Sequence, residues 1–113
     1  MRSMDRLSPA LAAVVAELRR KVETLYGRRF RDLLLYGSYA RGDQREGSDV
    51  DLLLLLEGPV DTGREILRLE SIVWPLSLEH AIVLSVMPVS HEAYQKGETS
   101  FLRIIRKDAT QAA

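Results

Sequence analysis

Residues that could hold a metal ion and a phosphate gather between Gly37 and Leu56. Asp49 and Asp51 open an apolar segment, and residues two apart on a strand project to the same face. Two carboxylates on one face suit a divalent cation, and Mg²⁺ in particular combines a few carboxylate oxygens with waters and substrate phosphates. Without a cation the two charges would repel each other. The pair therefore predicts a magnesium site for phosphoryl chemistry.

A phosphate could bind just before this pair. Gly37 leaves room for a phosphate to approach the backbone, and the amides of a helical turn starting at Ser38 can point at it. Arg41 lies in the same turn and could either contact a phosphate or fasten the loop. The expected nucleotide-binding residues are therefore Gly37, Ser38 and Arg41.

Two other phosphate-handling motifs are excluded by the same residues. Gly37 and Gly42 have the glycine spacing of a P-loop, but Asp43 stands where the lysine of that motif is required. Phosphatases and glycosyltransferases with an aspartate-x-aspartate pair place the apolar strand before the acids. Here the strand follows them, as residues 52–56.

Hydrophobic periodicity and capping residues indicate the elements that position this site. The continuous leucines after Asp51 indicate a central strand buried on both faces. Trp74 is expected to anchor the end of a helix in the core, and Pro75 to stop that helix. In chain order, the pattern predicts a helix from Ser8 and Pro9 to Gly27, a strand over 30–36, a turn over 38–42, a strand over 49–56, a helix from Asp61 or Thr62 to Pro75, a strand over 78–86 ended by Pro88, and helices over 92–96 and from Thr99 or Ser100 to Ile105.

Composition narrows the class of protein. The 113 residues fit a single domain spanning 1–113, and the 16 basic and 16 acidic residues cancel, so no overall field attracts nucleic acid or an anionic membrane. Cysteine is absent, which excludes disulfides, thiolate zinc sites and a cysteine nucleophile. The longest apolar run outside the first helix, at 52–56, is far shorter than the roughly 20 residues of a membrane span. We expect a cytoplasmic protein.

The whole motif resembles a known family. Gly37-Ser38-Tyr39-Ala40-Arg41-Gly42, followed by Ser48-Asp49-Val50-Asp51-Leu52, is similar to the minimal nucleotidyltransferase family of the DNA polymerase beta superfamily. The resemblance joins a glycine-serine pair, ten intervening residues and an aspartate pair. It implies an α+β, two-layer fold with a small mixed sheet packed with helices. It also implies magnesium-dependent transfer of a nucleoside monophosphate, with ATP as the expected triphosphate and the aspartates as metal ligands.

The resemblance also implies a third carboxylate, which would bind metal or act as general base from the next strand. The candidate is Glu79, although the family's spacing puts this acid nearer Ala81, about 7 Å along a strand. Members of the family are often antitoxins whose partners are HEPN-domain toxins, and some add AMP to a tyrosine of the toxin. A HEPN-type toxin is therefore the expected partner and acceptor.

Other functions remain open from the sequence. The chain could be a non-catalytic antitoxin that neutralises its partner by contact, which the doubtful third acid favours. Transfer to a small molecule such as an aminoglycoside is less favoured, because few residues follow the third strand. Phe101, Leu102 and Ile105 could form an exposed apolar stripe for a partner or a homo-oligomer, or pack on the sheet. No residue identifies the base of the nucleotide.

Overall fold

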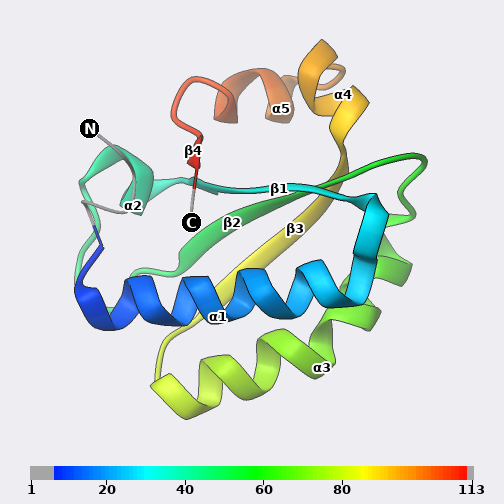
Figure 1. Cartoon of the computed structure of the whole chain (residues 1–113). Coiled ribbons are helices and arrows are strands. Elements are labelled where there is room, and N and C mark those ends of the chain that lie inside the picture. The colour runs from blue at the N-terminus through cyan, green and yellow to red at the C-terminus, as the bar shows by residue number, and fades with distance from the viewer. Residues whose placement is uncertain (1–6, 112–113) are drawn as a thin grey trace.

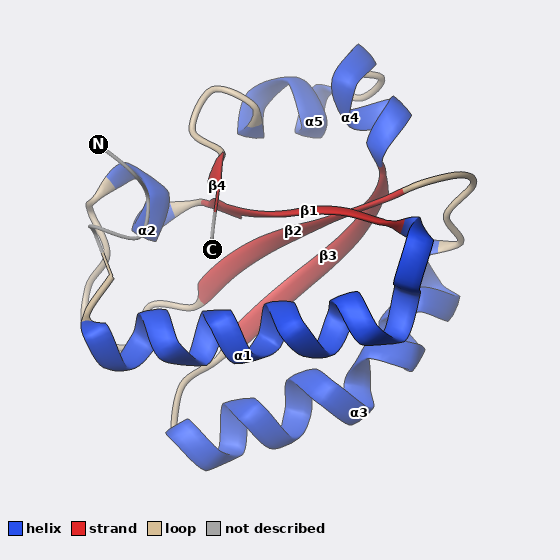
Figure 2. Ribbon diagram, viewed as in Figure 1, coloured by secondary structure: helices blue, strands red, loops and turns tan. Residues whose placement is uncertain are grey.

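A computed structural model describes residues 7–111 of the chain, which form helices on a four-stranded sheet (Figures 1 and 2). In chain order, the elements are α1 (Pro9–Tyr26), η2 (Gly27–Arg29, a 3-10 turn), β1 (Phe30–Tyr36), α2 (Ser38–Arg41), β2 (Val50–Leu56), α3 (Thr62–His80), β3 (Leu84–Ser90), α4 (His91–Lys96), α5 (Ser100–Ile105) and β4 (Thr110–Gln111).

The sheet is mixed, with strand order β3-β2-β1-β4. β2 pairs antiparallel with β1 and parallel with β3, and β4 pairs antiparallel with the other side of β1. β2 is thus a central strand, as its leucines predict, and successive side chains alternate between two buried faces. The predicted α+β class with a small mixed sheet is confirmed.

The two faces of the sheet have separate apolar cores. Leu52, Leu54 and Leu56 pack with α1 and α3 on one face, whereas Leu53 and Leu55 pack with α4 and α5 on the other. Figure 1 shows α1 and α3 side by side below the sheet and the short helices α4 and α5 above it. Asp51 alternates with Val50 and Leu52, and therefore lies on the α4–α5 face.

Local capping signals define the helix starts that the sequence predicts. Ser8 Oγ accepts the Leu11 amide at 3.1 Å, and Pro9 follows at the first helical position. Asp61 caps α3 by accepting the Arg64 amide at 3.2 Å, and Ser90 caps α4 in the same way. Each of these caps joins residues three positions apart along the chain, so they can be predicted from the sequence without knowledge of the fold.

The predicted boundary between α3 and β3 is wrong. α3 continues through Pro75 to His80, and β3 begins only at Leu84. Proline removes one helical hydrogen bond, but Leu76 is buried in the core just after it and holds the second half of the helix in place. Trp74 is 65% exposed rather than a core anchor, because it projects from the face of α3 opposite Leu76.

The predicted end of the third strand is also wrong. Pro88 lies inside β3, where it pairs with Leu54, and β3 is an edge strand with a neighbour on one side only. A proline is tolerated there because its nitrogen, which carries no hydrogen, can lie on the side of the strand that has no neighbour. The two-residue strand β4 falls where the pattern predicts no strand.

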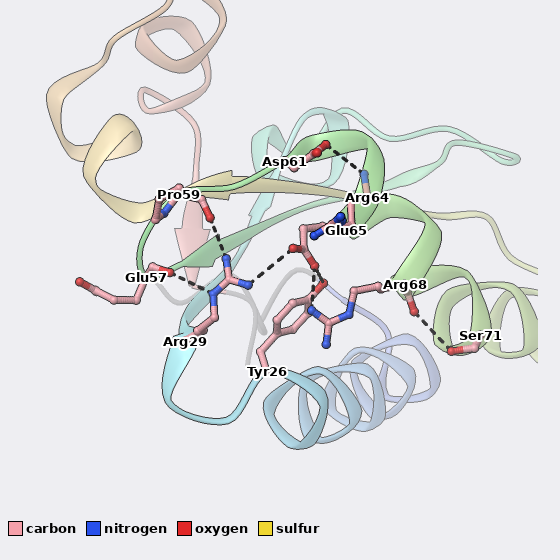
Figure 3. A network of polar contacts seen from close by, with 9 residues as sticks. All are labelled: Tyr26, Arg29, Glu57, Pro59, Asp61, Arg64, Glu65, Arg68 and Ser71. Atoms are coloured by element: carbon pink, nitrogen blue, oxygen red, sulfur yellow. Dashed lines mark hydrogen bonds and ion pairs between the residues drawn. The ribbon is translucent and has the colours of Figure 1, made fainter.

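A polar network surrounds the buried Glu65 carboxylate near the C-terminal end of β2 (Figure 3). The Glu65 side chain of α3 accepts a hydrogen bond from Tyr26 Oη at 2.9 Å and forms ion pairs with Arg68 at 3.3 Å and Arg29 at 3.5 Å. Arg29 also donates to the carbonyl oxygens of Glu57 and Pro59, just after β2. The network therefore joins α1, the end of β2 and α3. Burial and the bond to Glu65 raise the pKa of Tyr26 to about 12.

The described residues, 7–111, contain no helix that is both long enough and apolar enough to cross a membrane.

Candidate functional site

The predicted site lies where β1 ends and β2 begins. Tyr36, the last residue of β1, pairs in register with Asp51 of β2. Gly37 therefore lies directly against Asp51, although the two are fourteen positions apart in the sequence. Asp49 is the exposed loop residue before β2 begins at Val50.

Gly37 makes room for the Asp51 carboxylate. Its backbone has φ of 76° and ψ of −153°, a combination that residues with a Cβ atom rarely adopt. A Cβ placed on Gly37 would lie 3.2 Å from Asp51 Cγ and closer still to Oδ2. Glycine is thus required twice at this position, for its backbone angles and for the space beside the carboxylate.

α2 is a single helical turn that begins beside this carboxylate. The Arg41 amide donates to the Gly37 carbonyl oxygen at 3.1 Å, and the Gly42 amide donates to that of Ser38 at 2.9 Å. The amides of Ser38, Tyr39 and Ala40 come before the first bonded amide, as at the start of any helix, and can donate to an anion. Gly42 ends the turn in the left-handed region, with φ of 82°.

The two aspartates repel each other electrostatically. Partial burial raises the pKa of Asp51, the neighbouring Asp49 charge raises it further, and the Arg41 charge partly opposes this shift. A half-buried carboxylate beside a like charge is stabilised by a cation. Among the described residues, no group of three or more His, Cys, Asp or Glu side chains forms a metal site, so the acidic site consists of this pair.

Arg41 fastens the loops around the site. Its guanidinium lies 3.3 Å from Asp43 Oδ2 and 3.6 Å from Asp108 Oδ2, so it links α2 to the segment after α5. The hydrogen bond to Asp43 is the main cause that raises the pKa of Arg41, with a smaller contribution from Asp108. Of the two roles open from the sequence, loop fastening is the one for which the structure gives partners.

The structure does not bring Glu79 to the aspartate pair. The expectation that Glu79 lies on a strand is wrong, because α3 extends to His80. Its side chain is 66% exposed and lines a hollow between α1 and α3, on the opposite face of the sheet from Asp51. The periodic burial of Leu69, Ile72 and Leu76 runs through Pro75, and this pattern could have indicated the longer helix.

Two residues near Asp51, Ser85 and Tyr36, are not among the site residues that the sequence predicts. Ser85 pairs with Asp51 in the parallel register of β2 and β3, and is therefore the β3 residue beside that carboxylate. Tyr36 packs edge-on against Phe101 of α5, with ring centres 6.1 Å apart. Burial raises the pKa of Tyr36 and the Asp51 charge adds to this, so the phenol lies close to the acidic site. Only strand register could have identified Ser85.

Comparisons with known proteins identify the family of this chain. Residues 15–111 match the family described as a nucleotidyltransferase domain. Two relatives from Methanocaldococcus jannaschii are each named "Putative protein adenylyltransferase". One is 33% identical over 89 residues, which are 79% of this chain and 85% of the relative. The other is 32% identical over 82 residues, which are 73% of this chain and 76% of the relative.

Two further matches differ in coverage or identity. A bifunctional uridylyltransferase/uridylyl-removing enzyme of Psychrobacter cryohalolentis is 36% identical over 92 residues, which are 78% of this chain but 10% of that enzyme. A solved structure described as "Crystal structure of the toxin-antitoxin with AMP-PNP" superposes with a TM-score of 0.59, covering 86% of this chain and 71% of that one at 18% identity. That likeness shows a shared fold. With the family match over most of its length, the chain belongs to the nucleotidyltransferase domain family and is a minimal nucleotidyltransferase.

Proposed function

We propose that the chain transfers AMP from ATP to a hydroxyl group of a partner protein. The observation that carries this proposal is the Asp51 carboxylate packed against Gly37, with Asp49 beside it and the α2 amides next to it. This arrangement combines a cation site with a phosphate site, as nucleotidyl transfer requires. The names of the two Methanocaldococcus jannaschii relatives support a protein acceptor and an adenylyl group.

We assign Mg²⁺ to Asp49 and Asp51. Partial burial and the neighbouring Asp49 charge raise the pKa of Asp51, and a bound cation would stabilise its ionised form, so the donor set fits a divalent ion with oxygen ligands. When bound, the ion would neutralise charge on the triphosphate and on the departing pyrophosphate. Mg²⁺ is therefore expected to raise the melting temperature of the wild-type protein, and not that of Asp51→Asn.

The chain's own residues would bind and orient the nucleotide. Gly37, Ser38 and the first amides of α2 would hold phosphate oxygens, while Arg41 keeps the turn in place through Asp43. In the transfer, the acceptor oxygen forms a bond to the α-phosphorus. The bond from that phosphorus to the pyrophosphate oxygen breaks, and the acceptor proton is released.

Labelling with radioactive ATP tests this proposal. Wild-type protein with Mg²⁺ and its partner should give labelled partner, and Asp51→Asn should give none. Glu79→Gln is the matched control, because it also removes one carboxylate charge but lies on α3. Equal labelling by Asp51→Asn and wild type would contradict the proposal, and loss of labelling in Glu79→Gln would restore Glu79 to the mechanism.

The partner that we propose is a HEPN-type toxin encoded with this chain. The support is the description of the structural relative as a toxin-antitoxin, together with the family resemblance of the motif. ATP as substrate and the lack of cysteine suit the cytosol. Mass spectrometry of the partner purified with and without this chain tests the assignment, because adenylylation adds one AMP group to a hydroxyl side chain.

A non-catalytic antitoxin is the second candidate. Ser85, rather than an acid, pairs with Asp51, so a third carboxylate from β3 is missing at that register position. A purely binding antitoxin would neutralise its partner without nucleotide. Two measurements distinguish the candidates. Calorimetric titration measures binding of the Asp51→Asn protein to the partner, and an activity assay measures toxin inhibition in the absence of ATP.

A further inference from the structure

The outer face of α3 carries a largely apolar stripe that is exposed in the part of the chain that the structure describes. We define the α3 stripe as Leu67, Ser71, Trp74 and Leu78. Leu67 is 68% exposed, and Trp74 and Leu78 are each 65% exposed. At 100° per residue, these four positions lie within a narrow band on the side of the helix opposite Leu69 and Leu76 in the core. α3 is thus apolar on two opposite faces, and the fold uses only one of them.

The spacing of the α3 stripe indicates helix–helix packing. Its members are separated by four, three and four residues, which is the alternation of a coiled-coil seam. The same series of spacings is obtained when the helix is read in the reverse direction. In an antiparallel pair of α3 helices, Leu67 would therefore meet Leu78 of the second copy, and bulky Trp74 would meet small Ser71. The stripe complements itself in both spacing and size.

Charges beside the stripe are complementary in the same arrangement. Arg64 and Glu79 lie on the same flank of α3, near opposite ends, so an antiparallel pair would place each Arg64 close to Glu79 of the other copy. Both residues are exposed, and Arg64 forms no ion pair with any residue between 7 and 111. Surface pairs of this kind contribute little affinity, but they favour one relative orientation.

Hollows flank the α3 stripe on both sides. One, of about 430 Å³, lies between α3 and β3 and is lined by Trp74, Val73 and Val86 among others. The other, of about 500 Å³, lies between α1 and α3 and includes Ser71 and Glu79. Side chains from an opposing helix need such spaces in order to interdigitate.

We propose that two copies of this chain associate through the α3 stripe, with their α3 helices antiparallel about a two-fold axis. Figure 1 shows α3 on the side of the sheet opposite α4 and α5. Asp51 lies on the α4–α5 face, so both candidate sites would stay open in this dimer. A seam of four positions makes a small interface, so the dissociation constant is expected to be on the order of 10 µM.

Trp74 reports directly on this interface because it is the chain's single tryptophan. In a dilution series, its emission should shift to shorter wavelength over the same concentrations at which sedimentation shows the mass doubling. Trp74→Ala should be monomeric with an unchanged circular dichroism spectrum. Ile104→Ala is the matched control, since Ile104 is an equally exposed apolar residue on α5 and should leave the dimer intact.

The absence of native cysteine allows the orientation to be tested. A mixture of Leu67→Cys and Leu78→Cys proteins should form a disulfide-linked heterodimer on oxidation, whereas each variant alone should form little. Cross-linking of each variant with itself would overturn the antiparallel arrangement. A chain that is monomeric up to about 1 mM, or a Trp74→Ala variant that dimerises like wild type, would overturn the proposal and leave the stripe to a different protein.

Charge substitutions provide an independent test. Glu79→Lys should weaken association by about threefold, and Arg64→Glu combined with Glu79→Lys should restore it. Glu70 lies on the other flank near the two-fold axis, where the two copies would repel each other, so Glu70→Gln should strengthen association. Docking of an unrelated protein predicts none of these effects on self-association, and their joint absence would contradict the two-fold pairing.

Discussion

Glu65 and Asp51 are carboxylates near opposite ends of β2, and their surroundings differ. Glu65 is buried, accepts a hydrogen bond from Tyr26 and forms ion pairs with Arg29 and Arg68 (Figure 3). Asp51 is half-buried beside a like charge, and its pKa is raised as a result. The protein thus neutralises the acid that joins its helices. It leaves Asp51 at the candidate site partly buried beside a like charge, as expected if cation binding there is obtained at a cost in stability.

The two environments have opposite consequences for stability. An acid whose pKa is raised on folding stabilises the protein fully only below its unfolded pKa, about 4, and this contribution is lost as pH rises through the folded pKa. Ionised Asp51 is therefore destabilising at neutral pH. Glu65 contributes through its partners, and removing the carboxylate would leave two arginines without their buried counter-charge.

The largest expected effect is on catalysis at Asp51. Asp51→Asn keeps the shape of the side chain but removes its charge, so AMP transfer should fall by about 10³-fold or more. The same change should raise the melting temperature in the absence of divalent cations by roughly 3 °C, because it removes a partly buried charge that is also repelled by Asp49. Initial rates and thermal denaturation measure the two effects. If the variant were inactive and also less stable, Asp51 would stabilise the fold as Glu65 does, and the contrast between the two carboxylates would be wrong.

The largest effect on stability is expected at Glu65. Glu65→Ala should lower the free energy of unfolding by about 3 kcal/mol, because the buried Tyr26 hydroxyl loses its acceptor, a cavity is left in place of the buried side chain, and Arg29 and Arg68 lose their ion-pair partner. Urea denaturation measures this change. Glu57→Ala is the control, because Glu57 is exposed and its ion pair with Arg31 should contribute less than about 1 kcal/mol. Equal effects of the two substitutions would show that burial of Glu65 does not matter.

Gly37→Ala should affect both stability and activity. A methyl group would clash with the Asp51 carboxylate and require a rare backbone conformation, so we expect a loss of about 2–3 kcal/mol together with activity. Gly42→Ala has a similar positive φ with open space around it, and should cost only about 1 kcal/mol. In a double-mutant cycle, the cost of Gly37→Ala should be smaller when Asp51 is already alanine. Strict additivity would exclude the clash.

The smallest effect is expected at Tyr26. Tyr26→Phe should reduce stability at pH 7 by about 1–2 kcal/mol, because Glu65 loses a hydrogen-bond donor. The pKa of Tyr26 is raised from 10 to about 12, so the stability that its phenol contributes is complete below pH 10 and is lost as pH rises through about 12. The difference between wild type and variant should therefore shrink in that range, as urea midpoints at several pH values can show.

Local features of the sequence were read correctly. The caps at Ser8, Asp61 and Ser90 and the strands on either side of Gly37 have the predicted positions, because each depends on residues a few places away. The proximity of Gly37 to Asp51 was also predictable, because the family motif specifies it. The roles of these residues in binding and catalysis remain predictions.

Predictions that depend on distant packing are wrong. Pro75 predicts a helix end, but burial of Leu76 outweighs the missing hydrogen bond. Pro88 predicts a strand end, but on an edge strand a proline is tolerated. The prediction that Trp74 lies in the core fails because the face on which a side chain lies depends on the phase of the helix.

A glycine turn and two acids at a strand start are encoded locally, because conformational freedom and alternation along a strand are properties of neighbouring residues. The residue that lies beside Asp51 on the next strand depends instead on long-range packing. That residue is Ser85 and not Glu79, because the parallel register is set by where α3 ends at His80 and by how β3 packs against β2. Those contacts join residues more than thirty positions apart, and no local pattern encodes them.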